Sequence, residues 1–284
     1  MGRLDHFLRQ RSGARELGAT HPCGEGKALS HDELGIVVPS IAVGSVFPLP
    51  LAGWRTRGPR FIMGSGPRAV IFDVDGVLVD SYHAHLESWV LTAREHGLHI
   101  TEQEFATTFG QTSREAIARF WGPERSPAER EALDARKEVI YRDLIGARFP
   151  AMDGAVELID ALAAAGFLLA VGSSGPPENI ALTLDRLGRS ASFQARVTGR
   201  DVTRGKPDPQ VFAIAAERLG IPAARCAVIE DAPVGIAAAR AAGMASIALV
   251  GTAPAPALAA ADLMVTSLHE LTPPAVASLV DRQR

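Results

Sequence analysis

Two pairs of carboxylates stand out because each pair closes a short apolar run. Asp73 ends the run at 69–73 and Asp75 stands two positions later, while Glu230 and Asp231 end a later run of the same kind. Alternate residues of an extended chain point the same way, so Asp73 and Asp75 can aim their carboxylates at one place. Four carboxylates gathered in one pocket repel one another unless a cation is bound, and ligation by oxygen atoms suits Mg²⁺. The spacing therefore predicts a magnesium site, provided that the fold brings both pairs together.

A lysine and a small-residue turn supply groups that bind phosphate. Lys206 lies just before a predicted helix, where its ammonium can reach the same edge of a sheet. Ser173 offers a hydroxyl, and Ser174 and Gly175 offer backbone N–H groups near the start of a helix, an arrangement that binds anions. A carboxylate that is ionised and bound to Mg²⁺ can attack phosphorus, so this set of residues predicts phosphoryl transfer through an aspartyl phosphate.

Each of these features has a plainer explanation when it is taken alone. Paired acids at the end of a strand are commonly solvated turn residues, and Asp231 would also suit the positive end of a helix that begins at Pro233. A lysine before a proline is common in surface loops, and Ser-Ser-Gly is common in turns. The order of the features argues against these explanations, because acid pair, serine, lysine and second acid pair each stand at the matching end of an element.

The elements that must position these residues alternate between strands and helices from residue 69 onward. Apolar runs that predict buried strands occupy positions 69–73, 167–171, 226–229, 246–250 and 263–265. A helical period covers 153–165, with Asp153 as the expected N-cap. A second helix is predicted from Asp208, which would cap it, to Gly220, which would end it.

This alternation predicts an α/β fold with a doubly wound parallel sheet that is covered on both faces. Ligands bind to such sheets beyond the carboxyl ends of the strands, where the polar residues of three runs converge. Residues 81–149 break the alternation with a long helical pattern, in which Trp89 and Ala93 share one face. We expect an inserted helical module that overhangs the carboxyl edge and excludes water from it.

Composition narrows the class of protein. The chain has 284 residues, of which 47% are hydrophobic, so it is globular and long enough for a sizeable core. Its 29 Lys and Arg against 32 Asp and Glu give a net charge of −3. This balance lacks the excess of basic residues that is typical of nucleic-acid-binding proteins. Two cysteines, Cys23 and Cys226, make no disulfide framework. We expect a cytoplasmic protein whose partner is a small molecule; its oligomeric state is left open.

Residues 1–62 differ from the rest of the chain. They hold 9 Gly and 5 Pro and show no sustained helical period. The uncharged stretch from Leu34 to Trp54 has the length of a membrane helix, but three prolines interrupt it and two acidic residues precede it, so no membrane segment is expected. We expect 1–66 to be a weakly ordered extension, with Met63 as the natural start of the protein.

Taken together, these motifs resemble those of a known enzyme family. Residues 72–81, with the sequence Phe-Asp-Val-Asp-Gly-Val-Leu-Val-Asp-Ser, resemble the first signature of the haloacid dehalogenase (HAD) superfamily of phosphotransferases. The later signatures are matched in the family's order by Ser173, by Lys206 and by Glu230 with Asp231. The insertion after the first signature is similar to the helical cap of the β-phosphoglucomutase-like branch.

The resemblance implies a division of the chain and a role for each motif residue. Its Rossmann-like core would comprise 67–80 and 150–284, and its cap 81–149. Asp73 would be the nucleophile, and Asp75 the general acid and base that protonates the leaving oxygen and then activates water.

The remaining motif residues would bind the metal and the phosphoryl group. Mg²⁺ would be held by Asp73, by the backbone carbonyl of Asp75 and by Asp231, with Glu230 as a further ligand or a support. Ser173, Ser174 and Lys206 would bind the phosphoryl oxygens, and Lys206 would also restrain Asp73.

The same resemblance points to residues of the cap that face the substrate. His85, Ser113 and Arg114 stand at comparable places, although a solvated helix face explains His85 and Arg114 equally well. Gly110 precedes the pair Ser113 and Arg114 at the place of the family's glycine. Trp89 fits the core of the cap better. Lys137 and Tyr141, one helical turn apart, are weaker candidates.

These observations favour a Mg²⁺-dependent phosphatase that hydrolyses a small phosphorylated metabolite, with a sugar phosphate as the expected class. A β-phosphoglucomutase-like mutase is the alternative. The loop 174–178 reads Ser-Gly-Pro-Pro-Glu, where mutases of this branch carry a basic residue, and this departure favours hydrolysis. An alternative of another class is a catalytically silent regulatory module that keeps the fold.

Overall fold

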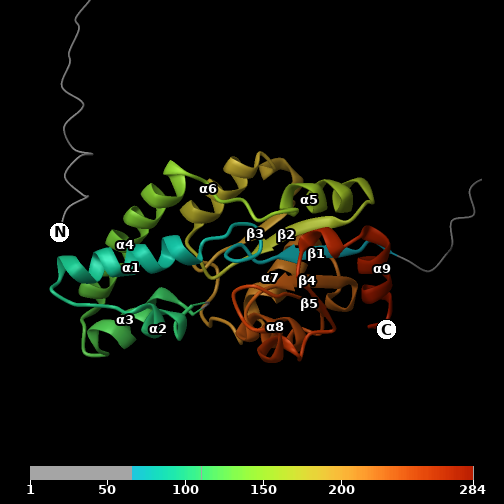
Figure 1. The fold of residues 1–284 in the computed structure, drawn as a ribbon. Coiled ribbons are helices and arrows are strands. Elements are labelled where there is room, and N and C mark those ends of the chain that lie inside the picture. Colours follow the sequence, from blue (N-terminus) through green and yellow to red (C-terminus); the bar gives the residue numbers. More distant parts are fainter. Residues whose placement is uncertain (1–65, 110, 284) are drawn as a thin grey trace, which may run out of the picture. The chain divides into compact units, whose positions relative to one another are not determined.

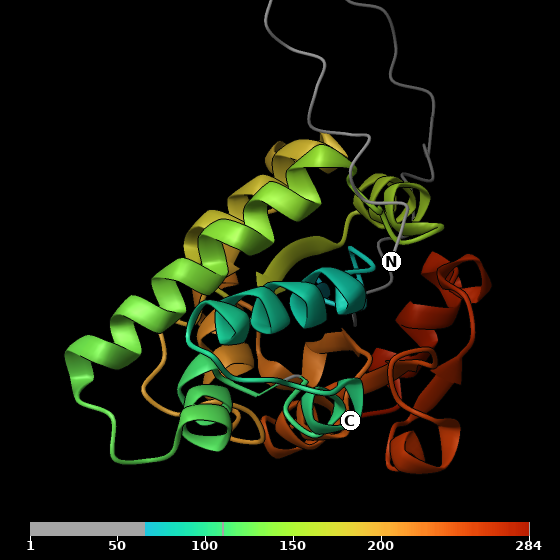
Figure 2. The same ribbon diagram turned by 60° about the vertical axis from the view of Figure 1, so that its left-hand side comes forward.

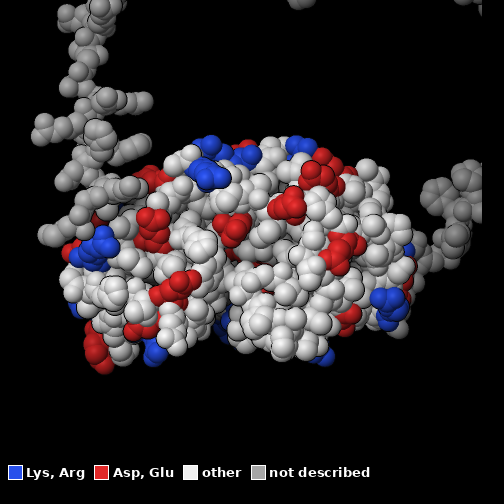
Figure 3. Space-filling view, in the orientation of Figure 1, with Lys and Arg blue, Asp and Glu red and all other residues white. Residues whose placement is uncertain are grey.

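The computed structural model describes residues 66–109 and 111–283. The predictions for residues 1–65, including the start at Met63 and the stretch Leu34 to Trp54, lie outside these residues. Within the described ranges no helix is both long and apolar enough to cross a membrane. On the visible part of the face shown in Figure 3, Lys and Arg are interspersed with Asp and Glu rather than gathered in one basic patch.

Six parallel strands form the sheet, in the order β3-β2-β1-β4-β5-β6. Their bounds are β1 Ala69–Phe72, β2 Leu168–Gly172, β3 Ala195–Val197, β4 Cys226–Glu230, β5 Ala245–Leu249 and β6 Leu263–Val265. The predicted doubly wound parallel sheet is confirmed. The edge strand β3 was not predicted, because it has three residues and the exposed Arg196 interrupts its apolar character.

Helices cover both faces of this sheet (Figure 1). Val70 and Phe72 of β1 pack on one face against α5 (Ala155–Ala164), α6 (Pro177–Leu187) and α9 (Pro273–Asp281). Ala69 and Ile71 point to the other face, toward α7 (Gln210–Leu219) and α8 (Pro233–Ala241). Short 3₁₀ turns connect the remaining segments at Ser190–Ser192, Ala223–Arg225, Ala255–Leu258 and Leu268–Glu270. The near-continuous apolar runs of the central strands follow from burial on both faces.

Four helices between β1 and α5 form the inserted helical module, called the cap below (Figure 2). They are α1 Tyr82–Glu95, α2 Glu102–Ala106, α3 Ser113–Trp121 and α4 Pro127–Ala147. The last three begin with capping boxes, in which a Thr or Ser and a Glu three residues later bind each other's backbone N–H. Trp89 and Ala93 belong to the cap's own apolar core. The two ends of the cap meet at an antiparallel bridge between Val79 and Ala151.

The helix boundaries correct one prediction and refine another. Asp153 does not cap α5, because the helix begins after Gly154, whose φ of 80° suits glycine. The Asp153 carboxylate instead lies 3.3 Å from His269 Nε2. The helix α7 begins at Gln210, and Asp208 Oδ1 still accepts a hydrogen bond from the Gln210 backbone N–H at 3.0 Å.

Candidate active site

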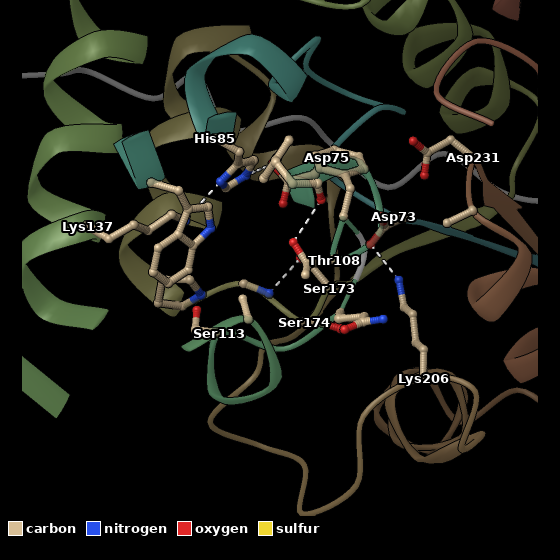
Figure 4. Close-up of a pocket in the computed structure, with 18 of the residues that line it drawn as sticks. Asp73, Asp75, His85, Thr108, Ser113, Lys137, Ser173, Ser174, Lys206 and Asp231 are labelled. Carbon is tan, nitrogen blue, oxygen red and sulfur yellow. Dashed lines mark hydrogen bonds and ion pairs between the residues drawn. The ribbon is translucent and has the colours of Figure 1, made fainter. Parts of the chain in front are cut away.

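The topology brings the predicted polar residues to one edge of the sheet (Figure 4). Asp73 follows β1, which lies between β2 and β4. Ser173 follows β2, and Glu230 ends β4, so all three stand at carboxyl ends of neighbouring strands. Together with Asp75 they line one pocket, whose far wall is the cap. The sequence-based prediction of convergence at this edge agrees with this geometry.

Lys206 joins the two carboxylate pairs. Its Nζ donates to Asp73 Oδ1 at 2.8 Å and to Glu230 Oε1 at 2.6 Å, and its side chain is almost fully buried. Burial alone would lower the pKa of Lys206, but the charges of Asp73 and Glu230 raise it above the usual value for lysine. The ammonium therefore stays charged at neutral pH and offsets part of the negative charge of the pocket.

Glu230 is held in place by both of its oxygens. While Oε1 accepts from Lys206, Oε2 accepts from the backbone N–H groups of Asp231 and Ala232 at 2.8 and 2.7 Å. These N–H groups lie at the start of α8, where a carboxylate is favourable. The glutamate thus orients Lys206 and the loop that carries Asp231.

Three carboxylates are crowded beside this lysine. Oxygens of Asp73, Glu230 and Asp231 lie within 4.8 Å of one another, and all three residues are buried. Burial raises the pKa of Asp73, and the charges of Glu230 and Asp75 raise it further. The charge of Lys206 lowers it, and the pKa that results is about 7. Burial and the charges of Glu230 and Asp73 raise the pKa of Asp231 well above its usual value. A bound cation would relieve this repulsion.

One oxygen of the cluster marks where such a cation fits. Asp231 Oδ2 is buried and has no hydrogen-bond partner within the described part of the chain. A Cβ atom added at Gly76 would stand 1.8 Å from this oxygen, so glycine is required for the close approach. Buried, unpaired carboxylate oxygens are costly unless they are protonated or bind a metal. The donor set of Asp73 and Asp231 therefore suits a hard cation such as Mg²⁺.

The turn after β2 also borders the pocket, and hydrogen bonds fix its shape. The Ser173 backbone N–H donates to Val197 O at 3.0 Å, and the Ser173 Oγ accepts from the Gly175 N–H at 3.0 Å. Ser173, Ser174 and Gly175 all line the pocket. The predicted phosphate-binding residues Ser173, Ser174 and Lys206 thus face one space together with Asp73.

Asp75 is the residue at which the cap meets the core. Its Oδ1 accepts from Ser81 Oγ at 2.7 Å, from Tyr141 OH at 3.2 Å, and contacts His85 Nε2 at 3.0 Å. Burial would raise the pKa of Asp75, but His85, the hydrogen bond from Ser81 and the charge of Lys137 together lower it below the usual range. Its Oδ2 lies near Gly175, and both residues line the pocket.

A buried lysine of the cap supports His85. Lys137 Nζ lies 2.9 Å from His85 Nδ1, and the His85 ring stacks on that of Tyr141 with centroids 4.1 Å apart. Lys137 Nζ also lies over the Trp89 ring, 5.3 Å from its centroid. Lys137 and Tyr141 therefore lie closer to Asp75 than the sequence indicated. Their spacing of one helical turn, which aligns both on one face of α4, was the available signal.

The other cap predictions fare differently. Ser113 and Trp89 line the pocket, and Trp89 also belongs to the cap core. Arg114 is exposed on α3 and is not among the lining residues, because it lies one position away from the inward face that Ser113 begins. Gly110 lies outside the described residues. Sequence reasoning did not identify several residues of the cap wall: Phe105, Thr108, Phe109, Gln111 and Glu138.

Comparisons with known proteins show the family to which the chain belongs. Residues 67–243 match the family model described as haloacid dehalogenase-like hydrolase. The chain is 32% identical over 208 residues to validoxylamine A 7'-phosphate phosphatase of Streptomyces hygroscopicus subsp. limoneus, a match that covers 72% of this chain and 95% of that protein. It is 33% identical over 212 residues to β-phosphoglucomutase of Bacillus subtilis, with 72% and 92% covered.

A solved structure shows the same fold. The crystal structure of β-phosphoglucomutase from Clostridium difficile matches with a TM-score of 0.70 and 24% sequence identity. The match covers 76% of this chain and 98% of that structure.

Proposed function

Because the chain belongs to the haloacid dehalogenase-like hydrolase family, we propose that it is a Mg²⁺-dependent phosphatase of a small sugar phosphate, acting through an aspartyl phosphate on Asp73. The chain is a phosphoric monoester hydrolase of the branch that resembles β-phosphoglucomutase. The observation that carries the proposal is the position of Lys206 between Asp73 and Glu230, beside the unpaired oxygen of Asp231. A cytoplasmic location is part of the proposal.

The metal would be held by Asp73, Asp231 and the backbone carbonyl of Asp75. Glu230 suits a supporting role better, because hydrogen bonds already occupy both of its oxygens. When bound, Mg²⁺ would neutralise the crowded carboxylates and polarise the phosphoryl oxygens.

The chain's own residues would divide the reaction into two displacements. In the first, a carboxylate oxygen of Asp73 forms a bond to phosphorus, the bond from phosphorus to the substrate oxygen breaks, and Asp75 gives that oxygen a proton. In the second, a water gives its proton to Asp75 and attacks phosphorus, which releases Asp73 and inorganic phosphate. The second step thus returns to Asp75 the proton that the first step uses. The contact with His85 and the hydrogen bond from Ser81, which lower the pKa of Asp75, favour the ionised form that accepts this proton.

Lys206 and the turn after β2 would bind the phosphoryl oxygens throughout. The Lys206 ammonium already lies 2.8 Å from Asp73 Oδ1, so it can balance negative charge that moves between the carboxylate and the phosphoryl group. Ser173, Ser174 and Gly175 line the same pocket as this lysine.

The charges of the pocket support hydrolysis over isomerisation. A phosphosugar mutase must hold a doubly phosphorylated intermediate while it turns, which calls for a second anion site. Lys137 and Lys206 are the lysines or arginines among the described lining residues, and each is already paired with carboxylates. The loop 174–178 adds no basic side chain. The 33% identity to a β-phosphoglucomutase keeps the mutase as the second candidate.

A panel of phosphate esters separates the candidates. The full-length chain with Mg²⁺ is incubated with hexose, pentose and polyol phosphates, and free phosphate and isomers are both measured. We expect free phosphate from at least one polyol or sugar phosphate. Isomer formation without phosphate release would favour the mutase, and no turnover of any ester would favour the regulatory module.

A further inference from the structure

We propose that Glu138 and Asn179 are positioning residues, which hold the cap against the core and thereby align His85 on Asp75. Glu138 lies on the cap helix α4, and Asn179 lies on the core helix α6. Neither residue belongs to the sequence motifs. The inference deepens the proposed function and rests on it, because it assigns the pair an effect on the acid step of Asp75.

The pair forms a buried contact across the boundary between cap and core. Asn179 Nδ2 donates to Glu138 Oε2 at 2.6 Å, and both residues are about 95% buried. Asn179 Oδ1 accepts from Arg142 Nη1, one turn further along α4, at 3.1 Å. The amide of Asn179 thus donates to Glu138 and accepts from Arg142, two residues one turn apart on α4. Together these bonds fix how α4 is rotated about its axis and how far it is shifted along α6. The two helices run beside each other in Figure 2.

The other oxygen of Glu138 continues the chain of contacts toward the reacting groups. Glu138 Oε1 accepts from Lys137 Nζ at 2.7 Å, and Lys137 Nζ in turn reaches His85 Nδ1 at 2.9 Å. The contacts run from Asn179 through the cap to Asp75. One carboxylate oxygen of Glu138 thus binds the core helix through Asn179, and the other binds Lys137.

The ammonium of Lys137 determines which ring nitrogen of His85 carries the proton. An ammonium is a donor without an acceptor site, so His85 Nδ1 must accept and the ring proton lies on Nε2. The Nε2–H then donates to Asp75 Oδ1, 3.0 Å away. This tautomer depends on Lys137 staying beside the ring, and the bond from Glu138 holds it there. Without this bond the flexible side chain of Lys137 would sample other rotamers.

Two of the connections between cap and core are therefore linked through Lys137. His85 contacts Asp75 on one side, and Glu138 contacts Asn179 on the other. Asn179 contacts neither the carboxylate cluster nor the proposed phosphate site. A substitution there should nevertheless alter the tautomer and alignment of His85.

Kinetics with two kinds of substrate test the proposal. Asn179→Leu keeps the size of the side chain and removes both hydrogen bonds, while Asn179→Asp keeps the acceptor for Arg142 and sets a carboxylate against Glu138. Both variants should lower kcat/KM at least about tenfold for the best alkyl phosphate of the panel, whose leaving oxygen needs a proton from Asp75. For p-nitrophenyl phosphate, whose leaving group departs without a proton, kcat/KM should change less than about threefold.

Arg186→Ala is the matched control, because Arg186 Nη2 also joins α6 to α4, at Gly146 O, but makes no contact with Glu138 or Lys137. It should leave kcat/KM for both esters unchanged. Equal losses for both esters in the Asn179 variants would mean a merely structural role and would overturn the proposal, as would no loss for either.

A second measurement does not depend on turnover. Nitrogen-15 NMR of labelled histidine distinguishes the two neutral tautomers, and His85→Gln identifies the signals of His85. We expect the Nε2–H form in the wild-type chain, a mixture in Asn179→Leu and no change in Arg186→Ala. Identical His85 signals in wild type and Asn179→Leu would overturn the proposal even if the chain proved to have no phosphatase activity. Conversely, a shift in tautomer without turnover of any ester would contradict the proposed function alone.

Discussion

Gly235 lies so close to Glu230 that a Cβ atom at position 235 would stand 1.8 Å from Glu230 Oε1. Gly235 is the third residue of α8, where glycine is an unfavourable choice for helix stability. The glycine at position 235 is therefore explained by the carboxylate of Glu230, for which a larger side chain would leave no room. Glu230 in turn sets the place of Lys206, at 2.6 Å.

We predict that Gly235→Ala will reduce activity despite the better helix propensity of alanine. The methyl group must displace Glu230, at an overpacking cost of about 1–3 kcal/mol, and Lys206 loses a partner. Thermal unfolding and kcat/KM check this. Gly251→Ala is the control, because a Cβ atom there meets no neighbour within 4 Å. Wild-type activity and melting temperature in Gly235→Ala would show that the site tolerates a shifted Glu230.

We predict that Asp73→Asn will abolish turnover and leave the melting temperature of the metal-free protein equal or higher. Asparagine cannot attack phosphorus as a carboxylate does, and it removes one charge from a cluster whose pKa values are raised by burial and mutual repulsion. Asp143→Asn, on the exposed side of α4, should change neither property. Full activity of Asp73→Asn would refute the assignment of the nucleophile.

We predict that Lys206→Ala will lower both stability and activity. Removing one partner of a buried ion pair leaves Asp73 and Glu230 uncompensated, which costs about 3–5 kcal/mol. Urea unfolding of the metal-free protein and kcat/KM are the measurements. Arg282→Ala, an exposed cation near the end of the chain, serves as the control. A loss of activity below about tenfold would place the lysine outside the chemistry.

Stability of the metal-free protein should fall as the pH rises from about 4 to about 7. The pKa of Asp73 is raised to about 7 in the folded protein, against about 3.9 in an unfolded chain. Between these values the folded state binds more protons, so each unit of pH in this range lowers the free energy of unfolding. Mg²⁺ should accordingly raise the melting temperature more at pH 7.5 than at pH 5. An equal effect of Mg²⁺ at both pH values would contradict the cluster of Asp73 and Asp231 as its site.

The motif residues of the core could be predicted because each stands beside a strong local signal. Asp73 and Glu230 mark the ends of central strands that are buried on both faces, and burial makes such strands legible as apolar runs. The strand β3 left no such signal, because the charged, exposed Arg196 separates its two buried apolar residues.

The contacts of the cap could not be predicted in the same way. Tyr141 reaches Asp75 across 66 residues, and Lys137 reaches His85 across 52. Such contacts depend on how α4 lies against α1 and the core, which no local period encodes. Asn179 was overlooked for the same reason, since its partners lie in another part of the fold.

The bridge between Val79 and Ala151 has a consequence for how the protein can diversify. It is reinforced by backbone hydrogen bonds from Asp80 to Pro150 and from Met152 to Leu78. Because the chain leaves and re-enters the core at adjacent points, everything between them can be lengthened, shortened or exchanged without pulling on the sheet. Substrate preference can thus change through substitutions, insertions or deletions in the cap alone, without altering the strands that position the proposed phosphate site.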